Sequence, residues 1–195
     1  MAPQSSKLCT IIYAIGVALS MAFSNAVAQP PTYDVVQPPA CTNNKEEAVS
    51  FIESKKGRSH IASGMAIRDQ SGKPVVYRSN YTVTPPDFQR FIDRHECAHH
   101  QTGDVDRPHP PRNGVAHLMN ESISDCIAIL RLRDEEGYNR AAFSKVANVM
   151  RVDMAKIGFP EISISSRISN IHNCYSRYGT PRDFIIGILK QRNLQ

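Results

Sequence analysis

A pair of histidines four residues apart constrains this chain more than any other feature. The run His95-Glu96-Cys97-Ala98-His99 follows the pattern H-E-x-x-H, within a segment whose apolar residues recur at helical spacing. Residues four apart lie one above the other on a helix, so both imidazoles can reach the same ion. Glu96 is offset by one residue and can reach a water on that ion without binding the ion. The fold therefore has to turn one face of this helix toward a second element that completes a metal site.

The second element is expected to be the next predicted helix. Catalytic zinc usually has three protein ligands and one open position. Glu121 and Asp125 lie four residues apart just ahead of an apolar stretch, and buried carboxylates are costly unless they are paired or coordinated. We expect Glu121 to bind zinc and Asp125 to accept a hydrogen bond from a ligand histidine, which fixes the tautomer of that histidine. The alternative is a solvated acidic turn.

These residues together predict hydrolysis of peptide bonds with one zinc ion. Zinc lowers the pKa of a bound water to about 7, and a carboxylate beside that water can take its proton. Glu96 is the expected general base, and the expected partner is a peptide or protein substrate. Two alternatives stay open: a secreted binding or assembly protein with a structural zinc site, and a helical domain without metal. An intact Glu96 argues against a purely structural site, which needs no base.

Three other histidines are weighed as contributors to the site. His100 is rotated by about 100° from His99 around the helix, so it is expected to be a supporting or surface group and not a ligand. His109 lies in a proline-rich loop, where a solvated side chain is expected. His117 lies one turn before Glu121 and is a candidate for contact with the substrate.

The order of the predicted elements favours an α+β fold, a small antiparallel sheet followed by a mainly helical domain. A short helix is expected first, and then two strands joined by the turn Asp69-Gln70-Ser71-Gly72. The second strand is a candidate edge for pairing with an extended peptide. Four long helices and a short last one follow, with Asn139 and Thr180 at the start of two of them. The predicted ranges are 44–54 for the first helix, 61–67 and 74–83 for the strands, and 84–103, 115–136, 139–156, 163–178 and 180 onward for the later helices.

The N-terminal residues are expected to direct export. Residues 1–28 resemble a secretory signal peptide, with Lys7, an apolar run and the small-residue site Ala26-Val27-Ala28. Residues 29–43 carry four prolines and are predicted to be an extended, poorly ordered lead-in, and residues 44–195 form the predicted domain. No later run is apolar enough to span a membrane, so we expect a periplasmic or secreted protein. The net charge is +5, but the basic residues are interleaved with acidic ones along the chain. This pattern gives nucleic-acid binding no support.

Four cysteines follow the predicted cleavage site, and an even number in an exported chain favours disulfides. Cys97 lies roughly 200° around the helix from His95, away from the metal, so it is not an expected ligand. We predict a bond between Cys97 and Cys126 that locks the two ligand-bearing helices together. Cys41 then pairs with Cys174. The alternative is four reduced, buried thiols.

H-E-x-x-H followed on the next helix by E-x-x-x-D is the pattern of gluzincins. Residues 95–128 resemble small exported bacterial metallopeptidases related to the HtpX and CAAX-prenyl-protease group. Phe159-Pro160 with Arg167-Ile168 is similar to a His-Pro…Arg-Ile segment of that group, although Phe159 replaces the histidine. Ser124 stands where the group usually has alanine. The resemblance implies a zincin-like fold and a zinc peptidase with ligands at His95, His99 and Glu121 and a base at Glu96.

Overall fold

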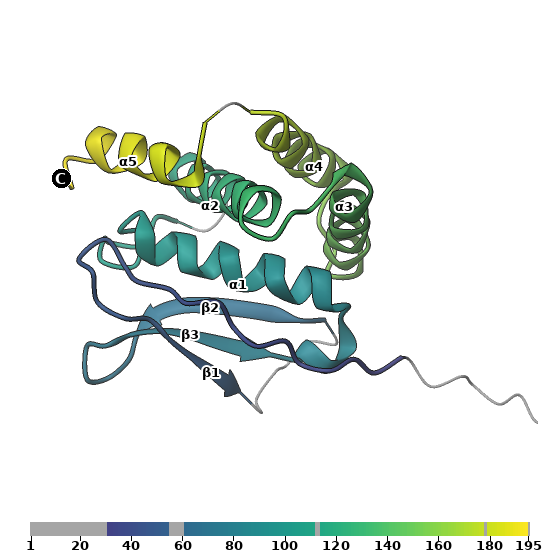
Figure 1. The fold of residues 1–195 in the computed structure, drawn as a ribbon, viewed down its shortest axis with the longest axis horizontal. Helices are drawn as coiled ribbons and strands as arrows, with labels where there is room; N and C mark the ends of the chain where they lie inside the picture. Colours follow the sequence, from purple (N-terminus) through teal and green to yellow (C-terminus); the bar gives the residue numbers. More distant parts are fainter. Residues whose placement is uncertain (1–30, 55–60, 112–113, 178, 195) are drawn as a thin grey trace, which may run out of the picture.

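One helix lies at the centre of the molecule, between a sheet and a group of helices (Figure 1). The computed structural model describes residues 31–54, 61–111, 114–177 and 179–194. The α+β class predicted from the sequence is confirmed, with the sheet before the helices along the chain. The elements in this part are β1 (Ser50–Ser54), β2 (Ser63–Arg68), β3 (Pro74–Ser79), a 3-10 turn (Tyr81–Val83), α1 (Pro86–Gln101), α2 (Val115–Asp134), α3 (Arg140–Lys156), α4 (Glu161–Tyr175) and α5 (Pro181–Gln191).

The sheet is mixed, not antiparallel as predicted, with strand order β1-β3-β2, because β1 joins it parallel to β3. The predicted hairpin is present: β2 runs antiparallel to β3, with Met65 opposite Tyr77. Its turn is built by Asp69, whose carboxylate accepts hydrogen bonds from the backbone N–H groups of Ser71 and Lys73. β3 is the central strand, so the prediction that it offers a free edge to a peptide is wrong. β2 is the edge strand on the side away from β1.

β1 lies where a short helix was predicted, and it pairs parallel to β3. The side chain of Asn43 accepts hydrogen bonds from the backbone N–H groups of Lys45 and Glu47, and Glu46 has a φ of 64°. An asparagine that bonds the backbone two residues on favours a turn over a helix. The acidic pair that looked like the first turn of a helix therefore belongs to this turn.

The central position of α1 follows from its two apolar sides. Pro86 occupies the first helical turn, where a missing N–H costs nothing. Phe91 and Ile92 are buried in the main core, which α1 shares with α2, α3 and α4. Burial of such side chains stabilises the fold by about 1.5–3 kcal/mol each. Cys97 lies on the sheet side, in a second cluster with Val76.

The later helices begin close to their predicted caps. Asn139 accepts hydrogen bonds from the first N–H groups of α3, and Thr180 forms a capping box with Asp183 at the start of α5. Each cap satisfies backbone donors that a helix start leaves without partners. α2 packs on both α1 and α4, so α2 holds a fixed place beside the helix that carries the histidine pair.

The lead-in was predicted to be extended and poorly ordered, but its described part, residues 31–43, is held on the domain by hydrogen bonds. Gln89, buried in α1, donates to the carbonyl of Asp34 and accepts from the N–H of Val36. The buried Arg78 donates to the carbonyl of Val36 and to the carboxylate of Asp93 on α1. These contacts join the lead-in, the sheet and α1. The predicted signal peptide, residues 1–28, lies outside the described residues.

The described part of the chain has two disulfides, but the predicted pairing is wrong. Cys41 is bonded to Cys97, and Cys126 is bonded to Cys174. The metal-ligand candidates of α1 face α2, so Cys97, turned away from them, also faces away from α2. It meets the lead-in instead, and Cys126 faces α4. Among the described residues, no helix is both long enough and apolar enough to cross a bilayer.

Candidate metal centre

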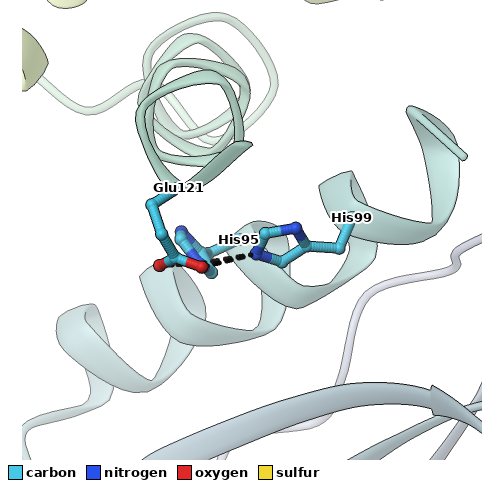
Figure 2. Close-up of side chains that lie close together, drawn as sticks. All are labelled: His95, His99 and Glu121. Carbon is cyan, nitrogen blue, oxygen red and sulfur yellow. Dashed lines mark hydrogen bonds and ion pairs between the residues drawn. The ribbon is translucent and has the colours of Figure 1, made fainter. Parts of the chain in front are cut away.

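Three side chains from two helices meet at one point (Figure 2). His95 and His99 extend from α1, and Glu121 extends from α2. The two Nε2 atoms lie 3.1 Å apart. That of His95 lies 3.4 Å from Oε2 of Glu121, and that of His99 lies 3.4 Å from Oε1. Together the three residues form a group that could hold a metal ion, as predicted. The predicted third ligand is therefore in place to complete the site.

The second nitrogen of His95 is bound by the predicted carboxylate. Its Nδ1 lies 2.8 Å from Oδ1 of Asp125, which is fully buried one turn after Glu121 on α2. Asp125 stays ionised, because burial raises its pKa but the charge of Arg167 and the hydrogen bond from His95 lower it more. An ionised carboxylate only accepts hydrogen bonds, so Nδ1 carries the proton and Nε2 faces the metal position.

His99 has a matching partner, Asp104, that the sequence analysis missed. Its Nδ1 lies 3.0 Å from Oδ2 of Asp104 and 3.1 Å from the hydroxyl of Ser124. Asp104 arrives there through the end of α1: Gly103 has a φ of 73°, and the N–H of Asp104 bonds the carbonyl of His99. This is the Schellman turn, in which the second residue beyond the cap folds back to the last turn. The glycine that ends the helix, followed by an acidic residue, was the available signal.

Arg167 from α4 binds the carboxylate behind His95. Its Nε lies 2.6 Å from Oδ2 of Asp125, its Nη2 lies 2.8 Å from Oδ1, and the same Nη2 lies 3.4 Å from Glu121. A guanidinium bound through two atoms holds a carboxylate in one orientation. The segment that contains Arg167 was noted from its resemblance alone, with no role assigned to this residue. In the fold it connects α4 to both acidic residues of α2.

Glu96 lies in the same cleft, against the edge strand. Its Oε2 accepts a hydrogen bond of 2.8 Å from the N–H of Ala66 on β2. Gly64 makes this approach possible, because a Cβ there would overlap Cγ of Glu96 and lie 2.9 Å from Cδ. Glu96 does not belong to the group of ligand atoms formed by the other three residues. Its carboxylate is therefore beside the metal position and not part of it, as the spacing predicts.

The group opens into a cleft of about 800 Å³ between β2, α2 and α4. His109 and His117 both line this cleft, and the apolar part of its wall includes Met65, Leu118 and Ile162. The exposed side chains of these three residues give the cleft an apolar rim. His100, in contrast, is buried, and its Nε2 lies 3.0 Å from the carbonyl of Val75, so it joins α1 to β3.

The charges at the centre favour binding of a cation. Burial lowers the pKa of both histidines, but the hydrogen bonds that they donate to carboxylates raise it more, to about 9 for His95 and about 10 for His99. Burial raises the pKa of Glu121, and its bonds to the two histidines bring it well below its usual range. A positive charge, whether two protons or a metal ion, is thus held between three carboxylates, those of Glu121, Asp125 and Asp104.

Compared with protein families, with curated proteins and with solved structures, the chain matches none of them. The chemistry of the centre is therefore argued from its own residues.

Proposed function

We propose that this protein is a zinc-dependent peptidase, with zinc bound by His95, His99 and Glu121 and with Glu96 as the general base. The observation that carries the proposal is the convergence of these three ligands beside Glu96 at the floor of an open cleft. Two imidazoles and one carboxylate are a ligand set of catalytic zinc, and a fourth position stays open in such sites.

The dimensions of the centre fit zinc. Ligand atoms about 2.0–2.1 Å from a tetrahedral ion lie about 3.3 Å from one another. In this structure the two Nε2 atoms lie 3.1 Å apart, and each lies 3.4 Å from a different oxygen of the Glu121 carboxylate, so this carboxylate faces both histidines at about that spacing. The hydrogen bonds of both Nδ1 atoms leave both Nε2 atoms for the metal, which is the usual arrangement behind zinc-binding histidines.

Each residue of the cleft has a distinct task in this proposal. Zinc would supply a water of lowered pKa and would polarise the carbonyl of the substrate. Glu96 takes the proton from that water and passes it to the leaving amine. Ala66 holds one oxygen of Glu96, so the carboxylate keeps its orientation toward the cleft. Asp125 and Asp104 hold the ligand histidines in place.

A non-catalytic protein with a structural zinc site is the weaker candidate. Structural sites are usually closed by four protein ligands. Here three ligands face a cleft of about 800 Å³, and the carboxylate of Glu96 lies within it. The cleft and the base both favour a bound substrate.

We also infer that the protein acts outside the cytoplasm. Disulfides form and persist in oxidising compartments, and the residues that the structure describes contain two. Cys97 lies within the H-E-x-x-H run itself, so one of these bonds belongs to the helix that carries the centre. The periplasm or the extracellular space is the proposed location, and peptides or proteins there are the proposed substrates.

Glu96→Gln tests the proposal directly. The purified protein is incubated with a peptide library with and without a chelator, and its zinc content is measured. We expect the variant to retain zinc and to lose hydrolysis by about 10²–10⁴-fold, because only the base is removed. Glu46→Gln is the matched control, since Glu46 is exposed and lies outside the cleft. Unchanged hydrolysis by Glu96→Gln, or no zinc in the unaltered protein, would contradict the proposal.

A further inference from the structure

Arg192, beyond the end of α5, contacts the surroundings of both metal-binding helices. Its Nη1 donates to the carbonyl of Thr102 at 2.7 Å and also to Oδ1 of Asp104. Its Nη2 donates to Oδ1 of Asn120 at 2.8 Å. Asp104 lies behind His99, and Asn120 directly precedes Glu121. One guanidinium thus joins the end of α1 to the turn of α2 that carries the third ligand.

The contact repeats an arrangement on the other side of the centre. His95 is bound by Asp125, which is bound by Arg167 of α4. His99 is bound by Asp104, which is bound by Arg192. In the second chain one oxygen of Asp104 faces the histidine and the other faces the arginine. The carboxylate that sets the orientation of each ligand is therefore itself oriented by an arginine from a different helix.

The burial of the ion pair between Arg192 and Asp104 indicates a role beyond stability. The side chains of Arg192 and Asp104 are 9% and 7% exposed. Removing two charges from water costs about as much as their attraction returns, so a buried ion pair is weak support for a stabilising role. Such a pair is better explained by what it holds in place. What Arg192 holds is the carboxylate on His99 and the residue beside Glu121.

We propose that Arg192 is a positioning residue of the metal centre, which makes α5 part of the site although it contributes no ligand. It orients His99 through Asp104 and keeps α2 at the correct distance through Asn120. This inference rests on the proposed metal function of His95, His99 and Glu121. It adds that zinc affinity depends on a residue 88 positions from the carboxylate it binds.

The test measures zinc affinity by competition with a chelator in the full chain. We expect Arg192→Met to weaken zinc binding by about 10–100-fold, the usual effect of losing support behind a ligand. Arg192→Lys should have a zinc affinity between those of the unaltered protein and Arg192→Met. An ammonium keeps the charge but cannot bind Asp104 and Asn120 as a planar fork. Arg182→Met is the matched control: Arg182 is an exposed arginine at the start of α5, and its loss should leave affinity unchanged.

A double-mutant cycle separates positioning from simple stability. If Arg192 acts through Asp104, Arg192→Met should add little to the affinity loss of Asp104→Asn, because residues in one network are not additive. Equal zinc affinity in Arg192→Met and the unaltered protein would overturn the inference. So would a double variant whose loss of affinity equals the product of the fold-losses of the two single variants. If Arg192→Met does not fold, the lysine variant decides in the same way. Absence of zinc binding in the unaltered protein would overturn the proposed function together with this inference.

Discussion

Each ligand histidine uses its two ring nitrogens for different purposes. Nε2 faces the shared metal position, and Nδ1 is held by a carboxylate, Asp125 for His95 and Asp104 for His99. The division follows from the ionised state of both aspartates, whose pKa values are lowered by the histidines and arginines around them despite their burial. At the scale of the residue, the centre is therefore prepared for a cation before any cation arrives.

The pH dependence of zinc binding follows from the same contacts. The pKa of His95 is raised to about 9 and that of His99 to about 10, so both hold a second proton at pH 7 in the protein without metal. Zinc must displace these protons. Affinity should therefore rise as the pH rises through neutrality and fall as the pH falls. Calorimetry in buffers of different ionisation enthalpy should find about two protons released per zinc at pH 7. Release of less than one proton would show that the histidines are already neutral.

Gly64 should be required for catalysis and not for metal binding. A side chain at this position would overlap Glu96, which must then leave the N–H of Ala66. Displacement of a catalytic group by about 1 Å costs about 10²-fold in rate. Gly64→Ala should therefore lose hydrolysis by about that factor while zinc content stays constant. Gly187→Ala on α5 is the control, because a Cβ there meets nothing within 4 Å. Full activity in Gly64→Ala would show that Glu96 is not held by this contact.

The sequence predicts the residues of the centre that lie close together in the chain. Helical spacing places His95 and His99 on one face, and the same spacing pairs Glu121 with Asp125. Asp104 could also have been predicted, because Gly103 directly before it ends the helix and turns the backbone toward His99. Arg192 was not, because it reaches Asp104 across 88 residues and no local pattern connects the two. Contacts of this kind depend on how helices pack, which the periodicity of one helix does not specify.

Among the elements, α1 is covered by others on two opposite sides. The sheet covers one side and the helices α2 and α3 cover the other (Figure 1). The two disulfides extend this arrangement outward: Cys97 connects α1 to the lead-in, and Cys126 connects α2 to α4. Neither bond joins α1 to α2 directly. The seam between these two helices is held by packing and by the side chains of the centre.

Removal of the bond between α2 and α4 should destabilise the protein without dismantling the centre. Cys126 and Cys174 are 48 residues apart, and closing a loop of that length restricts the unfolded chain by up to about 4 kcal/mol. Cys126→Ser combined with Cys174→Ser should lower the free energy of unfolding by about 2–4 kcal/mol, measured in urea. The pair Cys41→Ser and Cys97→Ser should have a similar effect, because its loop spans 56 residues. A peptide that contains Cys97 linked to Cys126 would refute this pairing.

The elements themselves were largely predictable, and the errors at β1 and at the cysteine pairing have physical causes. The hairpin and the five helices follow from turn residues, caps and apolar spacing. β1 was missed because Glu46 and Glu47 mimic a helix start, while the side chain of Asn43 turns the backbone instead. The cysteine pairing was wrong because the metal position lies between α1 and α2. Cys97, which points away from that position, therefore also points away from α2 and from Cys126.

At the scale of the whole molecule, the centre joins four helices. The three candidate ligands lie on α1 and α2, Arg167 lies on α4 and Arg192 lies beyond α5. A ligand that binds only the folded state stabilises it, by about 2.7 kcal/mol when its concentration is 100 times the dissociation constant. Zinc at that excess should raise Tm by roughly 5–10 °C for a domain of this size. A chelator should reverse the shift, and His99→Ala should not show it. An unchanged Tm in calorimetry would contradict zinc binding at this centre.

The order of the disulfides along the chain has a consequence for how the protein matures. Each bond joins neighbouring cysteines, Cys41 with Cys97 and then Cys126 with Cys174, so the two loops follow each other without overlap. If the chain is exported as proposed and enters an oxidising compartment from its N-terminus, the first two cysteines after the predicted signal peptide are already the correct partners, and so are the next two. Oxidation in order of arrival yields the native bonds directly, so export of this protein should not depend on an isomerase to exchange them.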